Sequence, residues 1–441
     1  MIKWAKDLFP LCRSLIGEGN RKTIKYFKKI NPEFKILKFK SGSKVFDWEI
    51  PNEWIIKDSY LQHESGKRFA EFKKSNLHVV NYSQPINKTF VKEKLLGKIF
   101  TEKSMPDAIP YVTSYYNKDW GFCLSENEKN TLPQGKYKAY INSRFEKSYL
   151  EIAEAVIKGK YHVVIDSEIK PGVMNYGEVL VPGKTKKEIL LSTYICHPSM
   201  ANNELSGPVL LNAILLYLKN NFKNLKYTYR FVLLPETIGS IAYISKRLKL
   251  LKQKMISGYV LTCVGDERCY SMVKTPYENT LADFSLSSAL IGIDKVKKYS
   301  FLHRGSDERQ YCAPGVDLPV SSFLRSKTYP EYHTSKDDFT LVTEKGLNES
   351  FQVMKNIIDA FETGLYPKFK NFCEPQLGKR NLYTVKFSKK NTYAEELYIR
   401  KNLLAYSDGK RSIFEISNIL QVPLKHLLEQ YKILIKSNVI N

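Results

Sequence analysis

The sequence predicts an α/β protein built on a doubly wound mixed sheet, and three observations lead to that prediction. Short apolar runs such as Glu188–Ile195 and Tyr227–Leu234 have the length and continuity of buried parallel strands. Stretches of helical period alternate with these runs. Polar residues follow directly after the runs, where an open sheet forms its binding sites. The chain of 441 residues has room for about three domains.

Residues 1–56 are predicted to form the first part of the α/β domain. Apolar residues recur at helical spacing over Trp4–Ile16, and a second helix is expected over Asn20–Lys29. Two strands, Phe34–Phe39 and Lys44–Ile50, are expected on either side of the turn Ser41-Gly42-Ser43.

Residues 57–149 differ in composition and predict a small β-rich inserted domain. Tyr, Asn and Lys are frequent there, and turns are expected at Pro106, Pro110 and Pro133. The β-like runs are His78–Tyr82, Tyr111–Thr113, Gly121–Leu124 and Tyr137–Ile141.

Residues 150–375 are predicted to complete the α/β domain by alternating strands and helices. The expected strands are Glu188–Ile195, Tyr227–Leu234, Gly258–Val264 and Leu318–Leu324, and the expected helices are Leu205–Leu218, Gly239–Leu251 and Glu344–Thr363. Residues 376–441 predict a winged helix-turn-helix domain. Its helices are expected near Glu395–Ala405, Ile413–Leu420 and Leu424–Ser437, with a turn at Val422-Pro423.

Composition excludes several classes of protein. The net charge is +24, but the lysines are spread along the chain without long blocks, so nucleic-acid binding is not expected as the main role. No apolar run reaches the ~20 residues that span a bilayer, so no membrane insertion is expected. The seven cysteines form no CxxC pair and predict buried thiols. Without a recognisable signal peptide, a cytoplasmic location is expected.

Four short motifs place candidate chemistry at predicted strand ends or in loops. His197 ends one strand and is followed by Asn203 and Glu204, and Glu236 ends the next strand. Asp307 lies between two arginines, and His333 precedes two aspartates. His, Asp and Glu are common metal ligands. Each motif also has a structural explanation, such as a capping glutamate or a surface ion pair, so no single motif decides.

The order of these residues along the chain resembles that of the zinc-dependent aminopeptidase superfamily. Longer motifs resemble one branch of it, the aminopeptidase-like proteins associated with polysaccharide biosynthesis. The motifs are LFPLCRSLIGEGNRKT, KVFDWEIPNEWIIKDSYL, IPYVTSYYNKDWGFCLS, ICHPSMANNELSGP, LLPETIGSIAYI, GSDERQYC and YPEYHTSKDDF. The resemblance implies a doubly wound mixed sheet of the zinc-aminopeptidase type, with a β-rich insertion and a C-terminal winged helix.

The resemblance also assigns roles to residues. His197 and Asp307 match ligands of a first metal ion, His333 matches a ligand of a second, and Glu236 matches the general base. Two positions depart from the pattern. Asn203 stands where a bridging carboxylate is expected, and Thr237 stands where a glutamate ligand is expected. A neutral amide is a poor bridge between two cations.

We therefore expect one zinc ion to bind well, or a two-ion site of incomplete occupancy. His197 and Asp307 anchor it, and Asn203 or Glu204 assists. The expected reaction is hydrolysis of an amide bond in a small peptide or a sugar-linked substrate, with Glu236 moving the proton. Tyr329 or Tyr332 is expected to stabilise the oxyanion, and Arg304 and Arg309 to hold an acidic group of the substrate.

Two other functions stay open from the sequence. Asn203 and Thr237 also suit a catalytically weak or inactive relative that binds a ligand and acts through its winged helix. A DNA-binding regulator is the third hypothesis, with Lys425, His426, Gln430 and Lys432 on the candidate recognition helix. A homo-oligomer is compatible with all three.

Overall fold

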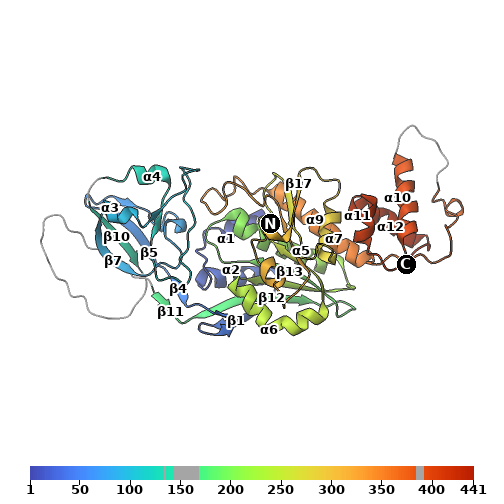
Figure 1. The fold of residues 1–441 in the computed structure, drawn as a ribbon, viewed down its shortest axis with the longest axis horizontal. Coiled ribbons are helices and arrows are strands. Elements are labelled where there is room, and N and C mark those ends of the chain that lie inside the picture. The colour runs from blue at the N-terminus through green and yellow to red at the C-terminus, as the bar shows by residue number, and fades with distance from the viewer. Residues whose placement is uncertain (134–135, 143–167, 384–391) are drawn as a thin grey trace.

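The computed structural model describes residues 1–133, 136–142, 168–383 and 392–441. Three parts follow one another along the long axis of the molecule (Figure 1). The inserted domain lies at one end, the large sheet with its helices is in the middle, and the C-terminal helices form the other end. The predicted boundary of the inserted domain at residues 149/150 lies outside the described residues.

The central sheet has eight strands in the order β1-β12-β14-β13-β15-β18-β16-β17. Its middle strands β14, β13, β15 and β18 run parallel, while β12 and β16 pair antiparallel with their neighbours in this middle group. This is a mixed sheet, as predicted. The bounds are β1 Lys35–Lys40, β12 Val173–Val181, β13 Glu188–Tyr194, β14 Thr228–Leu234, β15 Met255–Leu261, β16 Tyr270–Val273, β17 Val296–Tyr299 and β18 Val320–Leu324.

Helices cover both faces of the sheet. Strands such as β13 and β14 are therefore buried along their whole length. One apolar core lies under α1, α2, α5, α7 and α9, and a second lies under α6 and α8. The bounds are α1 Ile2–Leu8, α2 Glu18–Ile30, α5 Ser206–Asn221, α6 Ile238–Lys254, α7 Leu281–Ala289, α8 Glu308–Tyr311 and α9 Glu344–Thr363. A short 3-10 helix, Phe301–His303, precedes α8.

The carboxyl ends of β13 and β14 and the start of α5 come together at one edge of the sheet. A single π-helical turn, Ala201–Leu205, leads into α5, and such turns are frequent at functional sites. Gly207 makes this approach possible, because a Cβ there would lie 2.3 Å from the Leu261 carbonyl oxygen. The residues that follow these two strands, His197 and Glu236, approach each other to 3.8 Å.

The inserted domain centres on a four-stranded sheet in the order β6-β5-β10-β7, as the predicted β-rich composition suggested. Smaller pairs join β11 to β4 and β8 to β9, and β2 to β3 forms a hairpin just before the domain. The strands are β2 Lys44–Val45, β3 Trp48–Glu49, β4 Glu53–Ile55, β5 Asp58–His63, β6 Arg68–Phe69, β7 Ile86–Val91, β8 Ile99–Phe100, β9 Phe122–Cys123, β10 Lys136–Asn142 and β11 Glu168–Lys170; the helices are Asn76–His78 (3-10), α3 Lys92–Leu96 and α4 Glu126–Asn130.

Hydrogen bonds and an ion pair join the inserted domain to the loop of the central domain that carries His333. The backbone of Tyr111 donates to the His333 carbonyl at 2.7 Å, and Ile109 and Ser335 exchange hydrogen bonds. Lys336 pairs with Asp107 at 2.5 Å. Residues 107–111 therefore pack directly against this loop.

The C-terminal domain contains α10 Thr392–Tyr406, α11 Ile413–Leu420 and α12 Leu424–Lys436, preceded by a 3-10 helix, Gly378–Arg380. Its apolar faces join the core of the central domain, and Asn418 donates to the Phe284 carbonyl at 2.9 Å. Gln430, one of the four residues of the DNA-binding hypothesis, is buried and accepts hydrogen bonds from Arg400. It is therefore unable to read a base.

Some predicted elements were wrong in extent or kind. The helix predicted over Trp4–Ile16 ends at Leu8, because Pro10 cannot continue it. Lys44–Ile50 is a tight hairpin rather than one strand, with Phe46 at φ +56°. His78–Tyr82 and Tyr111–Thr113 form only isolated bridges. The expected helices at Gly239–Leu251 and Glu344–Thr363 are confirmed as α6 and α9.

Candidate active site

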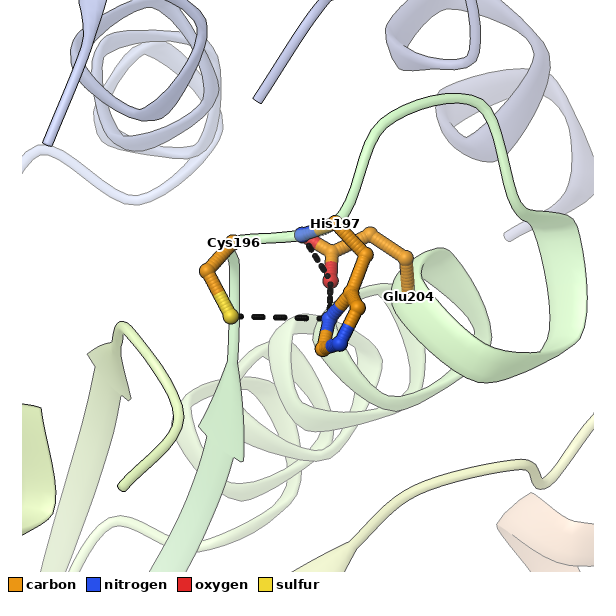
Figure 2. Close-up of side chains that lie close together, drawn as sticks. All are labelled: Cys196, His197 and Glu204. Atoms are coloured by element: carbon orange, nitrogen blue, oxygen red, sulfur yellow. Dashed lines mark hydrogen bonds and ion pairs between the residues drawn. The ribbon is translucent and has the colours of Figure 1, made fainter. Parts of the chain in front are cut away.

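His197 follows β13 and is held by a buried carboxylate. Glu204 from the π-helical turn places Oε2 at 2.9 Å from the His197 backbone nitrogen and 3.1 Å from its Nδ1 (Figure 2). When Glu204 Oε2 accepts a hydrogen bond from the Nδ1–H group of His197, the lone pair of Nε2 is free to bind a metal ion. Burial, followed by the charge of Arg13, lowers the pKa of His197 to about 3, so the ring is neutral.

Arg13 completes this support from the first part of the chain. Its Nε lies 3.1 Å from Glu204 Oε1 and donates to the His197 carbonyl at 2.9 Å. Arg13 and Glu204 are both fully buried, so each needs the other's charge. Glu204, predicted as an assisting ligand, therefore lies on the Nδ1 side of the ring and orients it.

Cys196, His197 and Glu204 form a group whose ligand-type atoms lie within 4.8 Å of one another. Figure 2 shows the Cys196 thiol beside Nδ1, at 3.5 Å. The thiol also accepts a hydrogen bond from the Glu236 backbone at 3.2 Å. Burial raises the pKa of Cys196 well above its ordinary value. We interpret this group as a hydrogen-bonded support for His197.

Glu236 follows β14 and faces the free side of the imidazole. Its Oε2 lies 3.8 Å from His197 Nε2, and its Oε1 accepts a hydrogen bond from Ser306 Oγ at 2.8 Å. The next residue, Thr237, has φ +62°, a costly conformation that aims the turn into the site. Burial and then the nearby Asp307 raise the pKa of Glu236 to about 8.

Asp307 lies at the start of α8 and is fixed through one oxygen. Its Oδ1 accepts hydrogen bonds from the Thr237 backbone at 2.8 Å and from Ser240 Oγ at 2.7 Å. Its Oδ2 is buried and finds no hydrogen-bond partner among the described residues. Burial raises the pKa of Asp307 to about 6. The two hydrogen bonds to Oδ1 fix the carboxyl group and so set the direction of Oδ2.

His333 is brought to the same place by the loop beside the inserted domain. Its ring centre lies 5.3 Å from that of His197 and 5.2 Å from that of Tyr111, and Tyr332 stacks on it at 3.9 Å. His333 has φ +58°, another strained position at the site. Burial and then His197 lower its pKa to about 3.

Asn203 occupies the middle of the π-helical turn. Its backbone donates to Asp337 Oδ2 at 2.9 Å, and its Nδ2 donates to the Tyr194 hydroxyl at 2.8 Å. These contacts fix the amide so that Oδ1 is the atom left without a partner. Asn203 can therefore supply a neutral oxygen ligand but no charge.

These residues fit a metal ion. Asn203 Oδ1, Asp307 Oδ2 and His333 Nε2 are buried, and none finds a hydrogen-bond partner within the described ranges. Buried polar atoms are normally satisfied, so three orphaned ligand-type atoms on residues packed around His197, Tyr194 and Glu236 indicate a site for a cation. Glu236 and Asp307 also place two carboxyl groups side by side, which a divalent cation would compensate. With Thr237 and Asn203 both neutral, the set suits one ion better than two.

Two cavities meet at Glu236. The larger, of about 630 Å³, is lined by Tyr194, Cys263, Ser306, Lys327, Tyr329 and Tyr332, among others. The smaller, of about 300 Å³, is lined by Trp48, Tyr115, Tyr116, Thr237 and Arg309, among others. A substrate that crosses Glu236 would thus place one part on each side of it.

The remaining predicted residues are distributed unevenly. Tyr332 lines the larger cavity and contacts the Asn203 amide, whereas the Tyr329 hydroxyl is committed to Asp337 at 2.8 Å. Arg309 lines the smaller cavity. Arg304 is exposed, lies over the Phe301 ring at 5.2 Å and lines neither of these two cavities.

Sequence reasoning missed the contributions from outside the strand ends. Arg13, Tyr111 and Tyr115 reach the site from segments far away in the chain, and nothing in their local spacing indicates a site. Each lies within a long motif of the family resemblance, LFPLCRSLIGEGNRKT or IPYVTSYYNKDWGFCLS. That membership was the only available signal.

Comparison with known proteins places this geometry in a family. Residues 2–364 match the model of a domain of unknown function (DUF4910), and residues 365–441 match a winged helix-turn-helix model. A protein of Clostridium acetobutylicum is 37% identical over 415 residues, 93% of this chain and 89% of its own length. It carries the provisional name of polysaccharide biosynthesis protein with aminopeptidase-like domain. The chain belongs to this aminopeptidase-like family.

Solved structures agree with this family membership. A crystal structure of a provisionally named peptidase from Clostridium acetobutylicum has a TM-score of 0.85 at 34% identity, covering 100% of this chain and 95% of that one. A peptidase M28 precursor from Shewanella amazonensis has a TM-score of 0.52 at 11% identity over 82% and 92% of the two chains, which shows the fold alone.

The predicted fold and family of this aminopeptidase-like protein are thus confirmed, including the C-terminal winged helix. The winged-helix match begins at residue 365, and the sequence-based boundary was 376. Within the described residues, no helix is long and apolar enough to cross a membrane.

Proposed function

We propose that this aminopeptidase-like protein is a metal-dependent hydrolase of an amide bond. The observation that carries the proposal is the set of three buried, unpartnered ligand-type atoms on Asn203, Asp307 and His333. His333 packs beside His197, Asp307 lies close to Glu236, and His197 Nε2 is 3.8 Å from Glu236 Oε2. Zinc is the proposed ion, because imidazole and carboxylate ligands suit it.

His197 and Asp307 would hold the ion, with Asn203 and His333 completing its surroundings. A divalent cation supplies Lewis acidity, which lowers the pKa of water and polarises a carbonyl oxygen. The chain supplies the rest. A cation beside Glu236 would favour its ionised form; Ser306 holds its Oε1, and its Oε2 would take the proton of the attacking water and return it to the leaving amine.

Tyr332 is the better placed of the two tyrosines to donate to the developing oxyanion. It lines the larger cavity next to His333, and Tyr329 already donates to Asp337. The two cavities give a substrate room on both sides of Glu236. The name of the Clostridium relative supports a substrate from polysaccharide biosynthesis, so an aminoacyl or N-acyl sugar is proposed beside small peptides.

The test compares wild type with Glu236→Gln, both loaded with zinc, on a panel of aminoacyl amides and N-acetyl amino sugars. Removing a general base is expected to lower the rate about 10²- to 10⁴-fold. Zinc content should be unchanged, because Glu236 is not an anchoring ligand. Glu429→Gln, an exposed change on α12, is the control. Equal activity of Glu236→Gln and wild type would contradict the proposal.

One observation favours a second candidate, a catalytically weak ligand-binding protein that acts through its winged helix. Asn203 and Thr237 remove two carboxylates from the expected ligand set. The C-terminal helices pack against α9 and α7, so a change at the site has a packed route to them. Zinc-loaded protein that binds but does not hydrolyse the panel would favour this candidate.

A further inference from the structure

The smaller cavity at Glu236 is built from three separate parts of the chain. Trp48 comes from β3, Tyr115 and Tyr116 come from the inserted domain, and Arg309 comes from α8. Its volume of about 300 Å³ accommodates a single ring with its substituents. Glu236 lies where this cavity meets the larger one.

The wall of this cavity is aromatic and accessible. Trp48, Tyr115 and Tyr116 are 41%, 40% and 50% exposed, which is unusual for such large apolar side chains gathered in one hollow. The Trp48 and Tyr116 rings meet at 6.1 Å, and the Tyr116 hydroxyl donates to the Glu49 carbonyl at 3.0 Å. The Trp48 and Tyr116 rings are therefore held in place before any ligand arrives, as flat surfaces for the apolar face of a ring.

Arg309 adds a positive charge that the chain itself leaves without an ion pair. Its Nη2 donates to the neutral Thr237 hydroxyl at 2.5 Å, and its Nε is buried without a partner. No carboxylate lies within ion-pair distance of Arg309 in the described ranges, whereas Arg13 and Arg325 are each paired. A guanidinium fork in this state suits a carboxylate or phosphate group.

We propose that this cavity is a substrate subsite for a sugar ring that carries an acidic group. The ring lies against Trp48, Tyr115 and Tyr116, and its carboxylate or phosphate pairs with Arg309. The inference rests on the proposed function, because the scissile amide is placed at Glu236, between this sugar and the part in the larger cavity. Thr237 contributes by presenting a neutral hydroxyl, so that the guanidinium charge remains available to the substrate.

The test is equilibrium binding, which needs no turnover. Zinc-loaded protein is titrated by calorimetry with glucuronic acid, glucose 6-phosphate, neutral glucose, acetate and inorganic phosphate. An acidic sugar is expected to bind at least about 10-fold more tightly than glucose and than either free anion. The tighter of the two acidic sugars identifies the acidic group. Equal affinities for acidic and neutral sugars would overturn the proposal.

Variants separate the guanidinium from a general charge effect. Arg309→Gln should weaken acidic-sugar binding about 10- to 100-fold, and Arg309→Lys should fall between it and wild type. Trp48→Ala should weaken binding of the ring about 3- to 10-fold. Arg411→Gln, an exposed change in the C-terminal domain, has the same change in net charge and should bind as wild type. Unchanged affinity in Arg309→Gln would refute the subsite.

The two proposals fail separately. Acidic-sugar binding that depends on Arg309, in a protein that hydrolyses no amide of the panel, supports the subsite and removes the proposed function. Hydrolysis that is indifferent to an acidic group and to Arg309→Gln supports the proposed function and removes the subsite.

Discussion

Charged side chains gather at both ends of the neighbouring strands β13 and β14. They are paired at the amino ends and partly unpaired at the carboxyl ends. At the amino ends, Arg230 pairs with Glu178 and with Glu188, the latter at 2.7 Å. Arg247 and Lys254 reach the remaining carboxylate oxygens at 2.9 and 3.7 Å. At the carboxyl ends, Glu236 and Asp307 lie close together, and Asp307 Oδ2 has no partner in the described parts of the chain.

The difference lies in whether the chain itself compensates the charges of each cluster. A buried charge is costly unless it is paired, so the Arg230 cluster is complete and holds three strands together. The Glu236 cluster is not compensated by the described parts of the chain, which agrees with the proposed metal ion. Four substitutions test this contrast, from the largest expected change in free energy to the smallest.

Breaking the complete cluster should cost the most. Arg230→Met leaves Glu178 and Glu188 buried without their shared cation, so the free energy of unfolding should fall by about 3–5 kcal/mol. Arg247→Met, at a side chain 34% exposed, should cost less than about 1 kcal/mol. Chemical denaturation measures both. Equal losses would contradict the special role of the fully buried pairings.

Loosening the support of His197 should weaken the metal site without destroying it. Glu204→Gln removes the charge that holds the imidazole, so zinc affinity should fall about 10- to 100-fold. Competition with a chromophoric chelator measures the affinity. Glu349→Gln, outside the site, is the control. Unchanged affinity in Glu204→Gln would show that His197 is oriented by its backbone alone.

Restoring a carboxylate should strengthen the site. Asn203→Asp places a charged oxygen where Oδ1 is unpartnered, so zinc should bind about 10-fold more tightly, or a second ion should appear. The same chelator assay, with elemental analysis, gives affinity and stoichiometry. Asn402→Asp on α10 is a control for added charge. Weaker zinc binding in Asn203→Asp would mean that the amide is preferred in this geometry.

Removing a charge at the carboxyl ends should raise the free energy of unfolding, whereas removing Arg230 at the amino ends should lower it. Glu236→Gln removes the charge that lies beside the buried Asp307 carboxyl, so the metal-free protein should gain about 1 kcal/mol in its free energy of unfolding. The Ser306 contact is retained by the amide oxygen. A loss of stability in Glu236→Gln would show that its carboxylate is already satisfied by the chain.

Much of this contrast could be predicted from the sequence, and the reasons are local. The apolar runs of β13 and β14 predict buried strands, and the polar residues after them predict a site at the carboxyl ends. The complete cluster at the amino ends was not predicted, because Arg230 and Glu178 meet only through strand pairing.

Side-chain directions and contacts between distant segments could not be predicted from the spacing of residues. Whether Glu204 binds a metal or orients His197 depends on a side-chain direction set by the π-helical turn. Arg13 contacts His197 across a separation of 184 residues along the chain, and Tyr111 contacts the same imidazole from the inserted domain. Sequence patterns of helical or strand period contain no information about such contacts.

The most direct test of the central claim is the zinc content of purified protein, measured by elemental analysis in wild type, His197→Ala and Arg230→Met. The account predicts about one zinc per chain in wild type, its loss in His197→Ala, and its retention in folded Arg230→Met. Absence of zinc from wild type even after addition of the metal would contradict the account, since the unpartnered atoms at the carboxyl ends would then not form a metal site.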